Sequence, residues 1–227
     1  MVLLLGNPIF ILLRKKLCNI SDLAAYNSMK GQEYPMERSD EQLMQDYQNG
    51  DKDAMKSIFQ GNKLRIINFC YGLLGNRADA EEAASDVFLA VVKYKDYYDS
   101  KRTFSTWIFT VARNQCINRI RKRNKTVSLW YAAEGNDGYE PWEIPDGGEN
   151  SREILAENER AHHVRKAITR LPYEQREAIV LKQYHGFSYA EISNILNCSL
   201  DKVKVLIFRA KERLREELAS LIGEELS

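Results

Sequence analysis

The sequence predicts an all-α protein of two small helical domains, joined by a flexible acidic linker and ending in a helix-turn-helix. Apolar residues recur at helical spacing through residues 39–123 and again through 152–222. The 227 residues are 44% hydrophobic and 29% charged, which allows two modest cores. Between the domains, residues 124–151 lack a sustained period and carry several breakers, namely Gly135, Gly138, Pro141, Pro145, Gly147 and Gly148.

Residues 1–38 precede the first helical pattern, and we expect a poorly ordered extension there. The apolar run 2–13, VLLLGNPIFILL, is too short to span a bilayer, and its basic residues follow it instead of preceding it. It is therefore neither a convincing membrane anchor nor a signal peptide. A mis-assigned start codon would explain the extension, because Met29 and Met36 lie just ahead of the first periodic sequence.

Helix boundaries in the first domain can be placed from local signals. Ser39 and Gln42 form a capping box, and the Gly50-Asp51 step separates the first helix from the second. Gly75 ends the second helix, and Phe104 begins the last one. The domain is therefore expected to be helical throughout.

The segment 77–94, RADAEEAASDVFLAVVKY, predicts an amphipathic helix with an acidic stripe. Its apolar side is formed by Ala80, Ala84, Val87, Phe88 and Val91. The opposite side carries Asp79, Glu82, Asp86 and Leu89. Carboxylates beside an exposed leucine suit a basic protein partner, and a merely solvated face is the alternative.

The segment 104–125, FSTWIFTVARNQCINRIRKRNK, predicts a largely buried helix with one polar flank and a basic end. The buried positions are Trp107, Ile108, Val111, Ala112, Ile117 and Ile120. The polar flank consists of Thr106, Thr110, Arg113, Asn114 and Arg121. The helix ends in Arg119, Arg121, Lys122, Arg123 and Lys125, enough positive charge to hold a phosphate backbone.

Just upstream, residues 93–104, KYKDYYDSKRTF, interleave aromatic and cationic side chains. The aromatic residues are Tyr94, Tyr97, Tyr98 and Phe104, and the cations are Lys93, Lys95, Lys101 and Arg102. Single-stranded DNA is bound by this combination, because bases stack on rings while the backbone follows the charge. Core aromatics at a helix junction are the competing explanation.

Residues 186–215, GFSYAEISNILNCSLDKVKVLIFRAKERLR, predict two helices joined by a tight turn. Ser188 and Glu191 cap the first helix, and the turn is Asn197-Cys198-Ser199, with Ser199 capping the second. Pro172 suits the first turn of the preceding helix.

The second helix of this pair has an apolar face and a basic face. Val203, Ile207, Ala210 and Leu214 face the first helix, and the opposite side shows Asp201, Lys202, Lys204, Val205, Phe208 and Arg209. This pattern is typical of a helix-turn-helix whose second helix enters a DNA major groove. An ordinary helical hairpin with a solvated face is the alternative.

Composition and motifs exclude several classes of function. The net charge of +1 means that any DNA binding is local. Four widely spaced cysteines and three histidines show no metal-ligand spacing, so we expect reduced thiols, a cytoplasmic protein, no metal and no cofactor. No catalytic constellation or phosphate-cradling loop is present, and we expect no enzyme.

Four runs together resemble an extracytoplasmic-function (ECF) sigma factor of the sigma-70 family, over about residues 39–218 and in the family's order. They are DEQLMQDYQNGDKDAMKSIF, LLGNRADAEEAASDVFLAVVKY, FSTWIFTVARNQCINRIRKR and LPYEQREAIVLKQYHGFSYAEISNILNCSLDKVKVLIFRAKERL. The resemblance implies domains σ2 (39–123) and σ4 (152–222) that direct bacterial RNA polymerase core, through its β′ and β subunits, to promoters. It implies promoter DNA and an anti-sigma factor as partners, and no small-molecule substrate.

The resemblance also implies residue roles. The acidic stripe, Asp79, Glu82, Asp86 and Leu89, would dock on the β′ clamp helices. The minus-ten element would be opened and read by Tyr97, Tyr98, Lys101, Arg102, Phe104, Trp107, Arg113, Asn114, Arg119 and Arg121. The minus-thirty-five element would be read by Ser199, Asp201, Lys202, Lys204, Val205, Phe208 and Arg209.

The chain departs from the family's usual pattern at two places. Ser85 and Val92 stand where the family usually has glutamine and tryptophan. The recognition helix reads Val203-Lys204-Val205-Leu206 where many members have Val-Lys-Ser-Arg, and Leu206 can tuck against the edge of the hairpin. The alternative function is a helix-turn-helix regulator without a sigma role, which would need a sensory domain with an apolar pocket.

Overall fold

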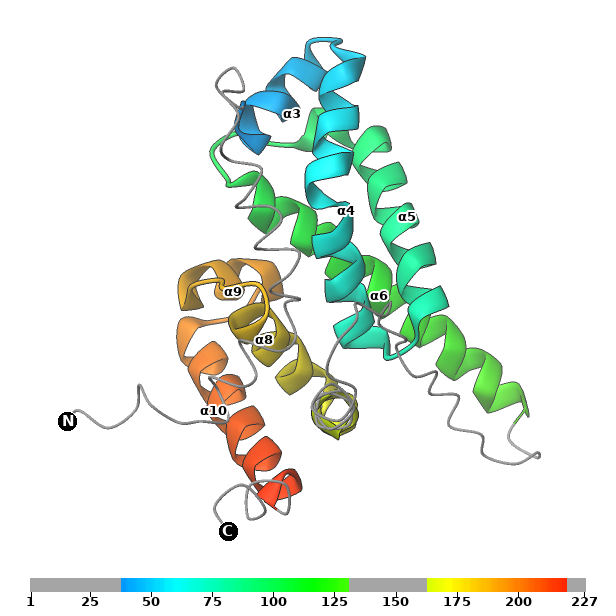
Figure 1. The fold of residues 1–227 in the computed structure, drawn as a ribbon, viewed down its shortest axis with the longest axis vertical. Coiled ribbons are helices and arrows are strands. Elements are labelled where there is room, and N and C mark those ends of the chain that lie inside the picture. Colours follow the sequence, from blue (N-terminus) through cyan, green and yellow to red (C-terminus); the bar gives the residue numbers. More distant parts are fainter. Residues whose placement is uncertain (1–37, 131–162, 220–227) are drawn as a thin grey trace, which may run out of the picture. The chain divides into compact units, whose positions relative to one another are not determined.

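The structure is a computed structural model, which describes residues 38–130 and 163–219 (Figure 1). In these two ranges the chain forms helices and no strand, which confirms the all-α prediction. The extension up to residue 37, linker residues 131–151 and residues 152–162 and 220–222 of the predicted second domain lie outside the described residues. The helices belong to two compact units, which we describe separately.

The first unit is built around a long central helix, α4. Its elements are α3 (Asp40–Gln48), α4 (Lys52–Leu74), α5 (Arg77–Lys93), the 3-10 helix η2 (Lys95–Tyr97) and α6 (Phe104–Trp130). Helix α4 contacts α3, α5 and α6, and α5 also packs on α6. The core includes the fully buried rings of Phe69 and Phe109, which meet edge to face with 5.0 Å between centroids.

The predicted boundaries of α3 and α4 are confirmed. The Gln42 amide donates to Ser39 Oγ at 3.2 Å, and Gln42 Oε1 accepts from the Ser39 amide at 2.9 Å, which completes the capping box. Asp51 caps α4, directly after Gly50 at φ 106°. Gly75 ends α4 at φ 73°, a left-handed conformation that costs glycine little.

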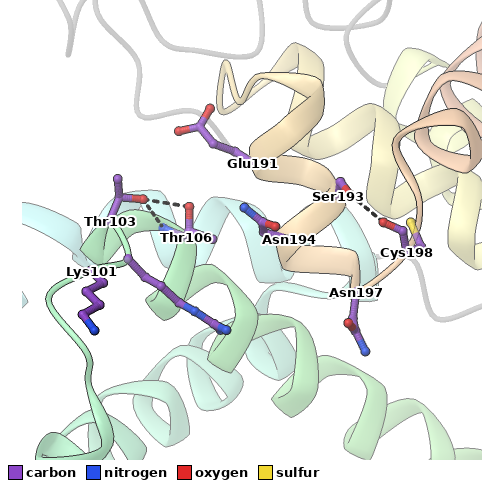
Figure 2. A pocket seen from close by; sticks show the side chains of 9 residues that line it. Lys101, Thr103, Thr106, Glu191, Ser193, Asn194, Asn197 and Cys198 are labelled. Atoms are coloured by element: carbon purple, nitrogen blue, oxygen red, sulfur yellow. Dashed lines mark hydrogen bonds between the residues drawn. The ribbon is translucent and has the colours of Figure 1, made fainter.

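Helix α6 is capped by a residue from α3. The backbone amide of Phe104 donates to Glu41 Oε1 at 2.9 Å, and the hydroxyls of Thr103 and Thr106 lie 2.8 Å apart in the same turn (Figure 2). Partial burial acts to raise the pKa of Glu41, but hydrogen bonds led by that from Phe104 outweigh it and lower the pKa below its usual value. The bond fastens α3 to the start of α6.

Two predictions about α6 are wrong. The helix continues to Trp130, past the expected linker boundary at 124, because the sequence offers no glycine or proline before Gly135 to stop it. Thr106, expected on the polar flank, is buried because its hydroxyl bonds to Thr103 within the helix start. Phe109, by contrast, was missing from the predicted core.

The second described range, 163–219, contains α8 (Tyr173–Gln183), α9 (Tyr189–Leu196) and α10 (Leu200–Glu217). Pro172 occupies the N-cap of α8. The predicted turn after α9 is confirmed, because Asn197 adopts φ 51° and the amide of Cys198 donates to the Ser193 carbonyl. Figure 2 shows Ser193 bonded to the Cys198 carbonyl, with Ser193 Oγ donating at 2.5 Å.

Helix α10 buries the face that the sequence predicts. Val203, Ile207, Ala210 and Leu214 are all buried, and Leu206 is buried beside them. The start of α10 is also tied to α8, because Lys202 Nζ lies 2.7 Å from Glu174 Oε1. The remaining face of α10 is therefore the one left to solvent.

Candidate nucleic-acid and protein interfaces

The acidic stripe lies on α5, away from the buried face of that helix. Ala80, Val87 and Val91 are fully buried, whereas Leu89 is 67% exposed. The Glu82 side chain is 70% exposed, and Asp86 is partly exposed. Helix α5 thus presents a leucine and carboxylates to solvent on one surface.

Arg119 of α6 is bonded to this stripe. Its Nη1 lies 2.9 Å from Glu82 Oε2, and its Nη2 lies 2.6 Å from Asp86 Oδ2. The bond from Arg119 lowers the pKa of Glu82, and the bond to Glu82 raises the pKa of Arg119 despite partial burial. Arg119, expected at the minus-ten surface, is therefore paired with the acidic stripe in this structure.

The aromatic segment divides into buried and open rings. Tyr98 is 5% exposed and Phe104 is fully buried, whereas Tyr97 is 80% exposed. The ring of Tyr98 packs 5.3 Å from that of Trp107, and its hydroxyl donates to the Arg102 carbonyl at 3.0 Å. Burial, with the charges of nearby carboxylates, raises the pKa of Tyr98 to about 12.

Tyr98 and Phe104, both expected at the minus-ten surface, are therefore buried in the core in this structure. Tyr97 remains an open ring, and Tyr94 lies beside it with 6.0 Å between centroids. Trp107 is partly exposed. Four other residues of the expected surface are exposed, namely Lys101, Arg102, Asn114 and Arg121, and Arg113 is half-buried. The exposed cations Lys101 and Arg102 follow the open ring of Tyr97 closely in the sequence.

Gln48 holds the aromatic segment in place, a role that could not be predicted from local sequence patterns. Its Nε2 donates to the Lys95 carbonyl at 2.8 Å and to the Tyr98 carbonyl at 3.1 Å. Lys95 is the first residue of η2, and Tyr98 directly follows it. Gln48, at the end of α3, therefore fixes the backbone that presents Tyr97. A glutamine at a helix end has no local pattern that would reveal such a long-range contact.

The seven residues expected at the minus-thirty-five surface lie on the outward face of α10 or, for Ser199, directly before the helix. Ser199, Asp201, Lys202, Lys204, Val205, Phe208 and Arg209 are exposed. Phe208 is 64% exposed and Val205 is 45% exposed, so this face of α10 presents two apolar side chains together with its charges. Lys204 Nζ lies 3.0 Å from Asp201 Oδ1, whereas Arg209 has no ion pair with any described residue.

Other kinds of site were not found in the ranges that the structure describes. No group of His, Cys, Asp or Glu side chains in them could hold a metal ion. None of the helices in these ranges is long and apolar enough to cross a membrane. The exposed aromatic and cationic surfaces therefore remain the features that call for a functional explanation.

A helical unit with an aromatic and cationic edge, followed by a helix-turn-helix, is an arrangement typical of DNA-binding proteins. The family model Sigma-70 region 2 matches residues 58–126, and Sigma-70, region 4 matches residues 162–214. The chain is 33% identical over 187 residues to "ECF RNA polymerase sigma factor SigW" of Bacillus subtilis, across 82% of this chain and 100% of that relative. The chain therefore belongs to the ECF sigma factors of the sigma-70 family, and its function is that of an RNA polymerase sigma factor.

Other relatives and solved structures agree. The chain is 24% identical to the RNA polymerase sigma-H factor of Pseudomonas aeruginosa, over 83% of this chain and 98% of that one. The sigma factor RpoE from Bartonella quintana, solved in complex with the anti-sigma factor NepR, has a TM-score of 0.58 and 25% identity, covering 72% of this chain and 98% of that chain. CnrH, solved with the cytosolic domain of CnrY, shares the fold with a TM-score of 0.58 at 20% identity, covering 81% of this chain and 99% of that chain.

Proposed function

We propose that α5 docks on core RNA polymerase, that the edge around Tyr97 holds the opened minus-ten strand, and that α10 reads the minus-thirty-five element as duplex. The observation that supports this most is the pair of exposed aromatic side chains, Tyr97 at 80% and Phe208 at 64%, each set among cations in its own unit. In this proposal the chain catalyses no reaction, and the polymerase carries out synthesis.

Core docking depends on Leu89 more than on the charge of Glu82 and Asp86. Arg119 already offsets these two carboxylates, so they present less net charge to a basic partner than the sequence suggests. Leu89 has no such contact, and burying its exposed apolar surface against a partner is favourable. The polymerase would therefore gain most from burying Leu89.

A matched pair of leucine substitutions tests this docking surface. Leu89→Ala should weaken capture of the full-length chain by core polymerase about tenfold, which corresponds to about 1.4 kcal/mol of binding free energy. Leu64→Ala on α4 is the control, because Leu64 is 63% exposed and outside the acidic stripe. Equal binding by both variants would remove α5 from the interface.

The charges on α10 can be tested by salt dependence. Arg209 is exposed and unpaired within the described ranges, so its charge is available to a phosphate, whereas Lys204 shares its charge with Asp201. Arg209→Ala should lower the slope of log affinity against log salt for promoter duplex by about one, the value for one phosphate contact. Lys204→Ala should change it less, and unchanged slopes in both variants would speak against α10 as the DNA-binding helix.

We also propose that an anti-sigma factor binds this chain, because the similar RpoE of Bartonella quintana was solved with one. The partner would compete with core polymerase. Purification of the tagged chain from its own cells, followed by addition of core, should release that partner. A complex in which core polymerase and the anti-sigma factor are bound to the same chain would contradict this competition.

A further inference from the structure

We infer that α10 selects A·T pairs by burying thymine methyl groups against Val205 and Phe208. This inference rests on the proposed binding of α10 to duplex DNA and adds the chemical feature of the bases that the helix reads. The residues concerned form an apolar stripe, which we define as Val205 and Phe208.

The apolar stripe points directly away from the unit's core. At about 100° per residue, Val205 and Phe208 lie about 60° apart, with their midpoint opposite the buried face of the helix. That buried face consists of Val203, Leu206, Ile207, Ala210 and Leu214. The stripe therefore lies outside the buried face of α10, and its 45% and 64% exposures leave apolar surface available to a ligand.

Cations border the apolar stripe on both sides. Lys204 lies about 70° from its midpoint in one direction, and Arg209 lies about 70° away in the other. Lys202 continues the Arg209 side, and all three side chains are exposed. A helix in a major groove meets base edges at its centre and a phosphate strand on each side, so this arrangement matches the groove in charge as well as in shape. An interface with another protein would instead favour few lysines around its apolar centre.

The chemistry of the apolar stripe determines what it can recognise. Valine and phenylalanine side chains carry no donor or acceptor, so they cannot read the hydrogen-bonding groups of the bases. The apolar feature that base edges present in the major groove is the C5 methyl of thymine. Val205 and Phe208 are four and seven residues after Asp201, within the first three turns of α10, where a recognition helix meets bases.

The test uses the full-length chain bound to core polymerase. Selection from a random duplex library first yields the preferred minus-thirty-five sequence. Each thymine in it is then replaced by deoxyuridine, which lacks only the methyl group. We expect affinity to fall about fourfold at one or two positions, the factor for exposing one buried methyl.

The variants assign that sensitivity to particular side chains. Val205→Ser and Phe208→Ala should each remove the deoxyuridine effect at one position, while circular dichroism shows unchanged helix content. Leu200→Ala is the matched control, because Leu200 is 41% exposed on α10 but lies about 110° from the apolar stripe. It should leave the deoxyuridine effect intact.

Three results would overturn the inference. One is a selected sequence whose thymines all tolerate deoxyuridine, and another is full sensitivity retained by both stripe variants. The third is loss of core association in the stripe variants, which would assign Val205 and Phe208 to a protein partner. Failure of the proposed function looks different, because the selection would then return no preferred minus-thirty-five sequence at all.

Discussion

Replacing Arg119 with alanine removes the ion pairs that fasten α6 to α5. The Arg119 side chain is 20% exposed, and it bonds Asp86 at 2.6 Å, where the carboxylate is 42% exposed. A hydrogen bond to a charged group contributes about 1.5–3 kcal/mol when buried, and the exposure of Asp86 moves this toward the lower end. The ion pair with Glu82 adds little to the stability of the fold, because the Glu82 side chain is largely in solvent. The expected loss is therefore about 1–2 kcal/mol of unfolding free energy.

Thermal unfolding of the full-length chain, followed by circular dichroism, measures this loss. For a unit of this size, about 1–2 kcal/mol lowers the melting temperature by about 5–10 °C. Arg121→Ala is the control, because Arg121 lies on the same helix, is exposed and has no partner among the described residues. Adding Asp86→Asn to Arg119→Ala should cost little more than Arg119→Ala alone, since the contact is already lost. This reasoning would be refuted if Arg119→Ala had the melting temperature of the wild type, or if Arg121→Ala lowered the melting temperature as much as Arg119→Ala does.

Three further predictions concern the cap, the turn and the aromatic segment. Glu41→Gln weakens the cap on the Phe104 amide. Because the pKa of Glu41 is lowered in the folded state, the carboxylate contributes stability above the unfolded pKa of about 4.3, and this contribution is lost as pH falls through the folded pKa. The difference in urea midpoint between wild type and variant should therefore shrink from pH 7 to pH 3. Asn197→Ala should cost about 1 kcal/mol in urea unfolding, and Asn197→Gly should be nearly neutral, because φ is 51°. Tyr97→Ala should reduce promoter opening, measured by permanganate reactivity, with unchanged stability, whereas Tyr98→Ala should lower the unfolding free energy by about 3 kcal/mol.

The sequence predicted helix boundaries well, because their signals are local. The Ser39 cap, the stop at Gly75 and the turn at Asn197 each depend on a few neighbouring residues, and the structure places all three as expected. The buried and exposed faces of α10 were also predictable, since a regular helix repeats its faces at a fixed angle.

Contacts between distant helices could not be predicted in this way. Arg119 is 33 residues from Asp86, and Glu41 is 63 residues from Phe104, and no local pattern joins either pair. The burial of Tyr98 was unpredictable for the same reason, since periodicity does not show whether an aromatic residue between helices is exposed or packs into the core. These contacts decide which residues of the expected minus-ten surface remain open.

Run-off transcription with purified core polymerase tests the central claim most directly. With no other sigma factor present, the chain should direct initiation at one start site on a promoter chosen by its own selected minus-thirty-five sequence. Leu89→Ala should reduce that transcript, and Leu64→Ala should keep it. A transcript that appears only when another sigma factor is added would show that the chain acts as a helix-turn-helix regulator, and would contradict the account.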